Sequence, residues 1–431
     1  MDNPSLIGLI PLILYIIFCF LPFGQIFAVL VGIVSAAIIG GHGLMEVAGA
    51  IRAGLGSFLG YIGLIILLGG GLGMVLKRTG VVHYMVNAVT GKLKVDSQNK
   101  AFFVVMLTSV VIVSLLGTMA GGNAIIAPIL IPIAASMGVV PNAMAVLLHG
   151  AGATGLFLGP FTPPVVALTE FTGVNYVQFL LNAGLPVSII MWIVTFFWAG
   201  HVQKKYAGKN SYAEAVESEA DKAMAANPKA GRASLVFFIS MVTLVAYGIV
   251  KEGGSTFVLA IMLITAALTG IAGGLKASDI IGAICDGAKN LIWLFFFFVL
   301  LDPFINFISD AGAFQALAVI LKPYVEGGSK VAFVAFTTLV GIFGVPGAAV
   351  AQAEILNKMF RALAETQGIP MTVWAIVLLI GSQMTSFAFP EGDMQGQMGL
   401  ARSDDLISVL QNGWLIVFFT TIYAVVRAMM L

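Results

Sequence analysis

Charged residues and cysteines are scarce in this sequence. Only 10% of the 431 residues are Asp, Glu, Lys or Arg, whereas 59% are hydrophobic, and the formal net charge is +1. This balance leaves no basic surface for nucleic acid, so no nucleic-acid partner is expected. The two cysteines, Cys19 and Cys285, lie singly in apolar runs, which argues against a disulfide framework or a cysteine-based metal site.

The sequence motifs of common enzymes are also missing. HExxH, GxSxG and GxxxxGK do not occur, so nothing indicates a metalloprotease, an α/β-hydrolase or a P-loop enzyme. Asp302 and Asp393 could in principle form an intramembrane aspartate pair, but their local sequences give no support for it. We therefore expect no enzyme and no cofactor.

Long apolar segments fill most of the chain. At roughly 20 residues per crossing, the length accommodates on the order of a dozen transmembrane helices. The segment 202–232 is the one clearly aqueous stretch, and its excess of Lys and Arg predicts that it lies on the cytoplasmic side. We predict an all-α polytopic membrane protein in the bacterial inner membrane, with repeats at 1–201 and 233–431 on either side of this linker.

Glycines and prolines of the two halves recur at a nearly constant spacing. The offsets all lie between 227 and 232 residues, and AVLLHG at 145–150 is answered by IVLLIG at 376–381. This indicates two homologous repeats. Internal repeats with glycine- and proline-interrupted segments at equivalent positions point to a secondary transporter, and its usual alternating-access geometry requires the two repeats to have opposite orientations. The matched pairs are Gly80 with Gly312, Gly117 with Gly344, Gly138 with Gly368, Pro141 with Pro370, Gly150 with Gly381, Pro160 with Pro390, and Gly184 with Gly413.

Each repeat contains an apolar stretch interrupted by glycine, proline and small polar residues. Such interruptions are tolerated at membrane depth only where the backbone lines a cavity inside protein. We interpret each stretch as a re-entrant helical hairpin followed by a broken transmembrane helix. The hairpins are expected at about 118–138 and 346–368, and the broken helices at about 141–172 and 370–400, with breaks within 157–164 and 386–396.

The exposed amino termini of half-helices attract anions without Lys or Arg, which predicts a carboxylate as the substrate. Hydroxyl and amide groups near the breaks suit carboxylate oxygens or Na+, although small polar residues also bond their own backbone. His149 could carry a proton or simply pack. The candidate substrate-binding residues are Thr118, Gly122, Asn123, His149, Thr154, Thr162, Pro163, Gln352, Ser382 and Thr385.

Acidic residues gather in the second repeat. Ionisable groups at membrane depth are costly and usually face a cavity, so we expect them to bind or relay the coupling ion. The candidates are Glu354, Glu391, Asp393 and Asp302. A Na+ site near Asn123 or Asp393 is one possibility, and a loop at 391–393 that reaches water is the alternative.

Several of these segments resemble the ion transporter superfamily of secondary carriers. Residues 46–80, EVAGAIRAGLGSFLGYIGLIILLGGGLGMVLKRTG, and the pair His149-Gly150 are similar to gluconate permease-type transporters. The runs APILIPIAASMGVVPNAM and GPFTPPVVAL resemble C4-dicarboxylate carriers and the large subunit of TRAP transporters. The resemblance implies paired hairpins, a cavity between a mobile domain and a scaffold, cation-coupled uptake of organic acids, and a homodimer.

Two family signatures are missing. The proline- and histidine-rich run that follows His-Gly in gluconate permeases is not reproduced, and the Ser-Asn-Thr signature of dicarboxylate/sodium symporters is absent. The resemblance therefore carries over neither a sugar acid, nor a dicarboxylate, nor Na+ coupling.

The sequence predicts a secondary active transporter for a small organic anion, coupled to H+ or Na+, that works by alternating access. A Na+/H+ antiporter without an organic substrate is the main alternative. A membrane subunit of a binding-protein-dependent, TRAP-like carrier is the second, and a channel is a third.

Overall fold

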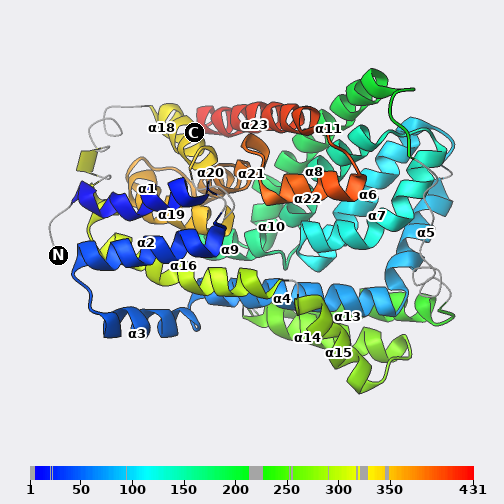
Figure 1. Cartoon of the computed structure of the whole chain (residues 1–431), viewed down its shortest axis with the longest axis horizontal. Helices are drawn as coiled ribbons and strands as arrows, with labels where there is room; N and C mark the ends of the chain where they lie inside the picture. Colours follow the sequence, from blue (N-terminus) through cyan, green and yellow to red (C-terminus); the bar gives the residue numbers. More distant parts are fainter. Residues whose placement is uncertain are drawn as a thin grey trace.

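The computed structural model describes residues 5–19, 21, 23–93, 95–212, 227–251, 253, 256–289, 291–316, 319–320, 329–344 and 349–431. All secondary-structure elements in these ranges are helices (Figure 1). Within the described residues, seven helices are long and apolar enough to cross a membrane, or up to eight if a bent pair counts as one span, and five shorter apolar helices accompany them. The prediction of an all-α polytopic membrane protein is confirmed.

The helices follow one another with short connections. The first half forms η1 (Leu6–Leu9), α1 (Ile10–Cys19), α2 (Gln25–Gly40), α3 (Leu44–Gly54), α4 (Phe58–Arg78), α5 (Val81–Leu93), α6 (Gln98–Leu116), α7 (Met119–Ser136), α8 (Pro141–Leu158), α9 (Pro163–Thr172), α10 (Tyr176–Phe179), the π-helix η2 (Leu180–Gly184) and α11 (Leu185–Tyr206). The second half forms α13 (Ala230–Val250), α14 (Phe257–Ala272), α15 (Ala277–Lys289), α16 (Ile292–Asp310), α18 (Lys330–Ile342), α19 (Ala349–Thr366), α20 (Met371–Gln383), α21 (Thr385–Ala388), α22 (Gly392–Ala401) and α23 (Leu406–Met429).

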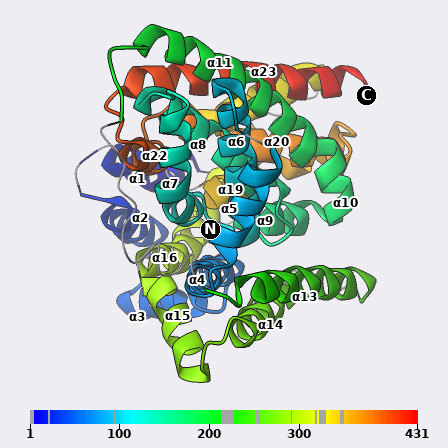
Figure 2. The same ribbon diagram turned by 90° about the vertical axis from the view of Figure 1, so that its right-hand side faces the viewer.

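The helices form two bundles. In Figure 2, α4, α13, α14 and α15 lie apart from α6, α8, α11 and α23. The α4 bundle consists of α1–α4 and α13–α16, and α4 packs on α14, α15 and α16. The α8 bundle consists of α6–α11 and α18–α23, with α8 in contact with α6, α11, α22 and α23. Helices from both halves of the chain meet in each bundle, so the 202–232 linker does not divide the molecule into two separate bodies.

Equivalent helices start at a constant spacing in the two halves. Helix α2 begins at Gln25 and α14 at Phe257, a spacing of 232, whereas α8 and α20 begin at Pro141 and Met371, a spacing of 230. These values fall within the offsets of the matched glycines and prolines. The inverted relation of the two repeats stays a prediction.

Glycines of α4 allow close helix packing. A methyl group added at Gly70 would lie 2.6 Å from the Gly287 carbonyl oxygen, and one at Gly71 would lie 2.9 Å from the Ile284 side chain. Gly69 faces Leu116 of α6 in the same way. Small residues bring helix backbones together in membranes, so this run joins α4 to α15 and to the α8 bundle.

The hairpins differ from the prediction in their position. Residues 119–136 form one helix, α7, although Pro128 and Pro132 lie inside it. The turn comes earlier, because Gly117 ends α6 with a φ of 68° and Thr118 caps α7. The antiparallel pair is therefore α6 with α7. In the second half, the predicted start at 346 lies outside the described residues, and 349–366 form the single helix α19.

The broken helices lie where the sequence predicts them. Helices α8 and α9 are bent by 44° across the interruption at 159–162. Pro163 and Pro164 begin α9, where their missing N–H groups cost nothing. In the second half, α20 and α21 end before the extended residues 389–391, and α22 starts at Gly392.

The described ends of the linker contact both bundles. Asn227 Nδ2 donates to the carbonyl oxygens of Thr79 (3.0 Å) and Gly273 (3.3 Å) at the ends of α4 and α14. Tyr212 OH donates to Ala401 O at the end of α22 (2.8 Å). The linker is thereby fixed to one end of the molecule, and its cytoplasmic location remains a prediction.

Candidate functional site

The tip of the α6–α7 hairpin packs against the break between α8 and α9. A methyl group added at Gly117 would lie 3.5 Å from Pro163 and 3.6 Å from Thr162. The Thr162 hydroxyl donates to the carbonyl oxygens of Leu156 (2.5 Å) and Gly159 (2.8 Å), which the break releases from helical bonding. Thr162 therefore stabilises the break itself, and Pro163 sets the direction of α9.

Asn123 on α7 is the centre of a buried polar cluster. Its side chain is fully buried, and Oδ1 accepts a hydrogen bond from Ser109 Oγ on α6 (2.6 Å). Its Nδ2 donates to Leu148 O on α8 (3.0 Å) and to Gln397 Oε1 on α22 (2.7 Å). Gly152 of α8 makes room for this amide, because a methyl group there would lie 2.7 Å from Asn123 Nδ2. One side chain thus joins three helices of the first half to the broken helix of the second.

Gln397 was not among the residues that the sequence singled out. Its side chain is fully buried, and its Nε2 has no hydrogen-bond partner among the described residues. An unpaired buried amide donor is costly unless a ligand or water completes it. Gln397 lies one helical turn after Asp393, so the two side chains are neighbours along α22. That spacing was the available signal.

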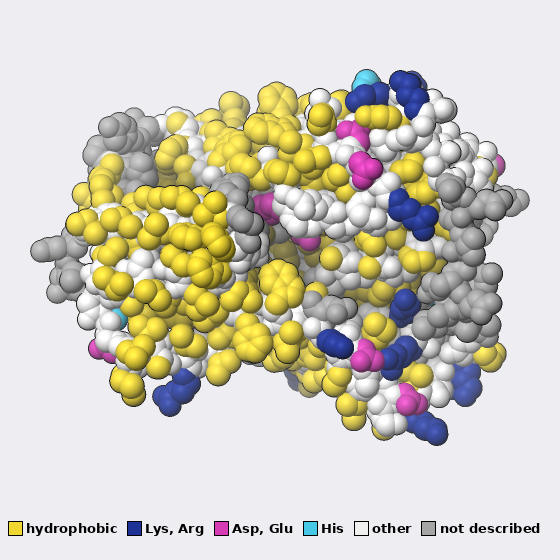
Figure 3. All heavy atoms as spheres, in the orientation of Figure 1, with side chains coloured by type: hydrophobic (Ala, Val, Ile, Leu, Met, Phe, Trp, Pro, Cys, Tyr) yellow, Lys and Arg dark blue, Asp and Glu magenta, His cyan; other side chains and the backbone are white. Residues whose placement is uncertain are grey.

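The face of α22 that carries Gly392, Gly396 and Gly399 is open. Methyl groups added at Gly392, Gly396 or Gly399 would meet no atom within 4 Å, and the Asp393 side chain is exposed. Glu391 caps the helix and is half-buried. Figure 3 shows this bare surface of α22, with acidic side chains at the end that faces the apolar surface of α1 and α2. A carboxylate of this kind can reach water and ions.

His149 lies in the middle of α8 and faces the second half. It is fully buried, and its ring centre lies 4.5 Å from that of Phe387 on α21. The backbone of Ser386, also on α21, approaches the imidazole ring within hydrogen-bonding range. His149 is therefore held by packing beside the second broken helix, and it does not join the Asn123 cluster.

The other candidate side chains have local partners. Thr118 Oγ1 accepts from Gly121 N (3.4 Å), whereas Gly122 packs against Val113. Thr154 donates to Ala151 O (2.6 Å) and accepts from Trp192 Nε1 (3.0 Å). These groups stabilise the helices around the break.

The second half repeats this arrangement. Gln352 Nε2 donates to Gly341 O (3.0 Å), so α19 is tied to α18. Ser382 Oγ accepts from Gln383 Nε2 (3.1 Å), and Thr385 Oγ1 donates to Ser382 O (2.6 Å), where α20 gives way to α21. These candidates lie at or beside the second broken helix. None of these hydrogen bonds connects them to the Asn123 cluster.

Glu354 and Asp302 belong to a separate polar network. Lys358 Nζ lies 3.0 Å from Glu354 Oε1 and donates to Asn306 Oδ1 (3.0 Å). Asn306 Nδ2 donates to Asp302 Oδ2 (3.1 Å). The sequence analysis missed Lys358 and Asn306, although each lies four residues after one of the acids and so on the same helix face.

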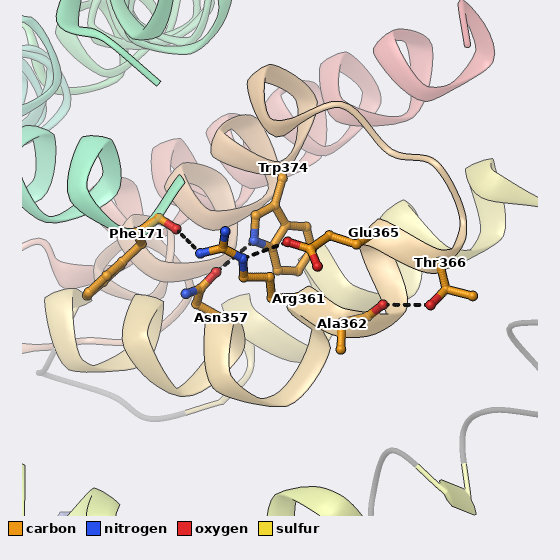
Figure 4. Close-up of polar contacts among 7 residues, drawn as sticks. All are labelled: Phe171, Asn357, Arg361, Ala362, Glu365, Thr366 and Trp374. Atoms are coloured by element: carbon orange, nitrogen blue, oxygen red, sulfur yellow. Dashed lines mark hydrogen bonds and ion pairs between the residues drawn. The ribbon is translucent and has the colours of Figure 1, made fainter. Parts of the chain in front are cut away.

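Arg361 joins the two halves at the end of α9. Its Nη1 donates to Phe171 O (2.7 Å), and its Nε lies 2.9 Å from Glu365 (Figure 4). A cation at a helix carboxyl terminus bonds the last carbonyls and opposes the helix dipole. Asn357, on the same helix as Arg361, accepts a hydrogen bond from Trp374 Nε1 on α20 (2.9 Å). Helix α19 is therefore fixed to both α9 and α20.

A cleft of about 780 Å³ separates the bundles beside the first break. Pro160, Phe161 and Glu170 line it on the α9 side, and Val258 and Ile261 line it on the α14 side. Among the described residues, no three His, Cys, Asp or Glu side chains come together as metal ligands.

Comparisons with known proteins agree with this architecture. The sequence matches the family model described as DcuC, C4-dicarboxylate anaerobic carrier, over residues 23–429. The solved YdaH transporter of Alcanivorax borkumensis has a similar fold, with a TM-score of 0.62, 16% identity and 97% of each chain covered. MtrF of Neisseria gonorrhoeae has a TM-score of 0.48 and 15% identity, over 90% of this chain and 84% of that one. A search of curated protein sequences gives no match.

The family match identifies a carrier and not an enzyme, as the missing catalytic motifs predicted. The family description also names C4-dicarboxylates, a substrate class that the absent Ser-Asn-Thr signature had left open for this chain. The chain is an integral membrane protein and a secondary carrier for organic anions. Because the match spans nearly the whole sequence, the chain belongs to the DcuC family of C4-dicarboxylate anaerobic carriers.

Proposed function

We propose that this chain transports a C4-dicarboxylate by alternating access, coupled to H+ or Na+. The observation that carries the proposal is the Asn123–Gln397 contact. It places the hairpin of the first half against the broken helix of the second, next to the open face of α22. Together with the family match, this makes α7, α9 and α22 the best candidates for the substrate site.

The anion would be held by helix termini and neutral donors. The amino ends of α7, α9 and α22 each carry the positive end of a helix dipole, equivalent to about half a positive charge, although α9 offers fewer N–H groups because it begins with Pro163 and Pro164. The unpaired Nε2 of Gln397 adds a donor that suits a carboxylate oxygen. Asn123 would orient Gln397 through their shared hydrogen bond and would not itself be free to bind substrate.

Coupling follows from charge. A dicarboxylate carries two negative charges, and Glu391 and Asp393 at the start of α22 would repel it if they were ionised. Binding of H+ or Na+ to these acids would remove the repulsion, so cation and anion would bind together. Transport without the cation would be disfavoured because uncompensated charge is costly at membrane depth. A homodimer in the bacterial inner membrane, with the linker cytoplasmic, completes the proposal.

Ligand-dependent stability tests the substrate class. The purified protein is heated with a C4-dicarboxylate, with C3 and C5 dicarboxylates, and with a C4 monocarboxylate, at several pH values with and without Na+. A ligand that binds the folded state raises its apparent melting temperature. We expect the C4-dicarboxylate to raise it most, and only when Na+ is present or the pH is lowered. No stabilisation by any dicarboxylate would contradict the proposal.

A further inference from the structure

The network of Asp302, Asn306, Glu354 and Lys358, here named the Lys358 bridge, connects the two bundles. Asp302 and Asn306 lie on α16 of the α4 bundle, and Glu354 and Lys358 lie on α19 of the α8 bundle. The contact between the bundles is the hydrogen bond from Lys358 Nζ to Asn306 Oδ1, 3.0 Å long. In Figure 1, α16 and α19 lie in the part of the molecule that holds α1–α3, away from the end where α5 and α15 lie.

The charges of the bridge depend on Lys358. The Lys358 ammonium lies close enough to the carboxylates of Glu354 and Asp302 to attract both of them electrostatically. Arg361, one turn later on α19, is engaged with Phe171 O and Glu365. Side-chain exposure is 33% for Lys358 and 13% for Glu354, and the second oxygen of Glu354 has no hydrogen-bond partner within the described part of the chain. Without Lys358, two carboxylates would face each other with little access to water.

A bridge of this kind favours the arrangement in which its partners touch. The α16–α19 contact is small, because α16 packs mainly on α2, α3 and α4, and α19 packs mainly on α9 and α20; elsewhere the bundles meet where α4 packs on α6, α7 and α9. Any sliding of α19 along α16 by one helical turn would separate Lys358 from Asn306. The Lys358 ammonium would then keep Glu354, on its own helix, and lose the α16 partners.

We propose that the Lys358 bridge holds the α8 bundle against the α4 bundle in the present conformation, and that Lys358 must leave Asn306 during each transport cycle. This inference rests on the proposed function, because alternating access supplies the movement. It gives Glu354 and Asp302 a conformational role, distinct from ion binding at Glu391 and Asp393. Lys358 acts as a positioning residue and does not touch the substrate.

A reversible cross-link tests the bridge. Asn306→Cys and Lys358→Cys are combined in a chain that carries Cys19→Ser and Cys285→Ser, and uptake of a C4-dicarboxylate into proteoliposomes is measured after oxidation and again after reduction. The matched control is Thr195→Cys with Asn412→Cys, a contact inside the α8 bundle (3.4 Å). We expect oxidation to lower uptake about tenfold or more in the test pair, reduction to restore it, and the control pair to be unaffected.

The outcomes separate the two proposals. Full uptake by a test pair whose thiols are shown to be joined overturns the bridge while the proposed function stands. A parent chain that takes up no dicarboxylate overturns both. A second variant, Lys358→Gln, is expected to change the maximal rate about fivefold with the KM unchanged, whereas Lys358→Arg retains the parental rate. An equal effect of Lys358→Gln on KM would contradict the positioning role.

Discussion

Asn123 Nδ2 on α7 and Gln397 Oε1 on α22 lie 2.7 Å apart in the buried centre of the α8 bundle. The two residues are 274 positions apart in the sequence and belong to opposite halves of the chain. Their hydrogen bond fixes the broken helix of the second half against the hairpin of the first. The predictions below begin from this contact.

Asn123→Ala should impair both stability and uptake. The change leaves Gln397 Oε1, Leu148 O and the Ser109 hydroxyl without their partner, which costs about 1–3 kcal/mol for each buried group that stays unpaired. We expect a lower melting temperature and at least about tenfold weaker dicarboxylate binding. Asn412→Ala, a buried amide of the same bundle away from this cluster, is the control and should leave the affinity unchanged. Equal affinities of Asn123→Ala and the parent would show that the site lies elsewhere.

Gly152→Ala should displace the Asn123 amide. The added methyl group would lie 2.7 Å from Asn123 Nδ2 and 3.0 Å from Ser109 Oγ. Overpacking of this kind costs about 1–3 kcal/mol, so thermal unfolding should occur at lower temperature and uptake should fall. Gly200→Ala on α11, where a methyl group meets no atom within 4 Å, should be neutral in both measurements. If Gly152→Ala transported like Gly200→Ala, close packing at Asn123 would be unnecessary.

Thr162→Ala should loosen the first break. It removes the hydroxyl that donates to the Leu156 and Gly159 carbonyl oxygens, and the loss of a buried hydrogen bond costs about 1–3 kcal/mol. Thr162→Ser keeps the donor and should retain uptake. Thr169→Ala, which removes a hydroxyl bonded within regular helix α9, is the matched control. Uptake assays of the three variants, side by side, separate the break from the helix, and equal loss in all three would refute the role of Thr162.

Asp393→Asn and Glu391→Gln should alter the coupling. Each variant removes a carboxylate that we propose binds H+ or Na+ at the start of α22. The dependence of uptake on pH or on Na+ concentration should flatten in both, whereas Asp404→Asn, an exposed acid after the end of α22, should keep the parental profile. Unchanged profiles in both site variants would remove these acids from the coupling mechanism.

Asp405 predicts a pH-dependent contribution to stability at the start of α23. Burial alone would raise the pKa of Asp405, but hydrogen bonds from Ser408 and Tyr206 lower it below its usual value. A carboxyl whose pKa is lowered by folding stabilises the fold at pH values above its pKa in the unfolded chain, which is about 3.9. This stabilisation is lost as the pH falls through the lowered pKa of the folded state. Asp405→Ala should therefore lower the melting temperature at pH 7, and the gap to the parent should narrow below about pH 4. A constant gap from pH 7 to pH 3.5 would contradict the assignment.

Local signals in the sequence were sufficient for the broken helices. Proline next to glycine disfavours a continuous helix, and Gly159-Pro160 in the first half and Pro390 with Gly392 in the second led to interruptions being expected near 159–162 and 389–391. The hairpin was placed too late, at about 118–138, because this stretch is interrupted by glycine, proline and small polar residues. The helix continues through Pro128 and Pro132, and the actual turn uses Gly117 in the left-handed conformation.

Contacts between distant segments could not be predicted in the same way. Asn123 was selected for its polarity in an apolar run, but its partners Ser109 and Gln397 depend on how α6 and α22 pack against α7. Thr154 and Thr162 were selected for the same reason, but their hydroxyls donate hydrogen bonds to backbone carbonyl oxygens. Spacing of four residues was the remaining clue, for Asp393 with Gln397 and for Glu354 with Lys358.

Uptake by the purified chain alone in proteoliposomes tests the central claim most directly. Vesicles are given an inward gradient of H+ or of Na+, a labelled C4-dicarboxylate is added outside, and internal pH is followed with a dye. The account predicts accumulation of the dicarboxylate under at least one gradient, with no other protein present, and none when the gradient is dissipated. Proton movement driven by Na+ without any dicarboxylate, together with no dicarboxylate accumulation under either gradient, would contradict it.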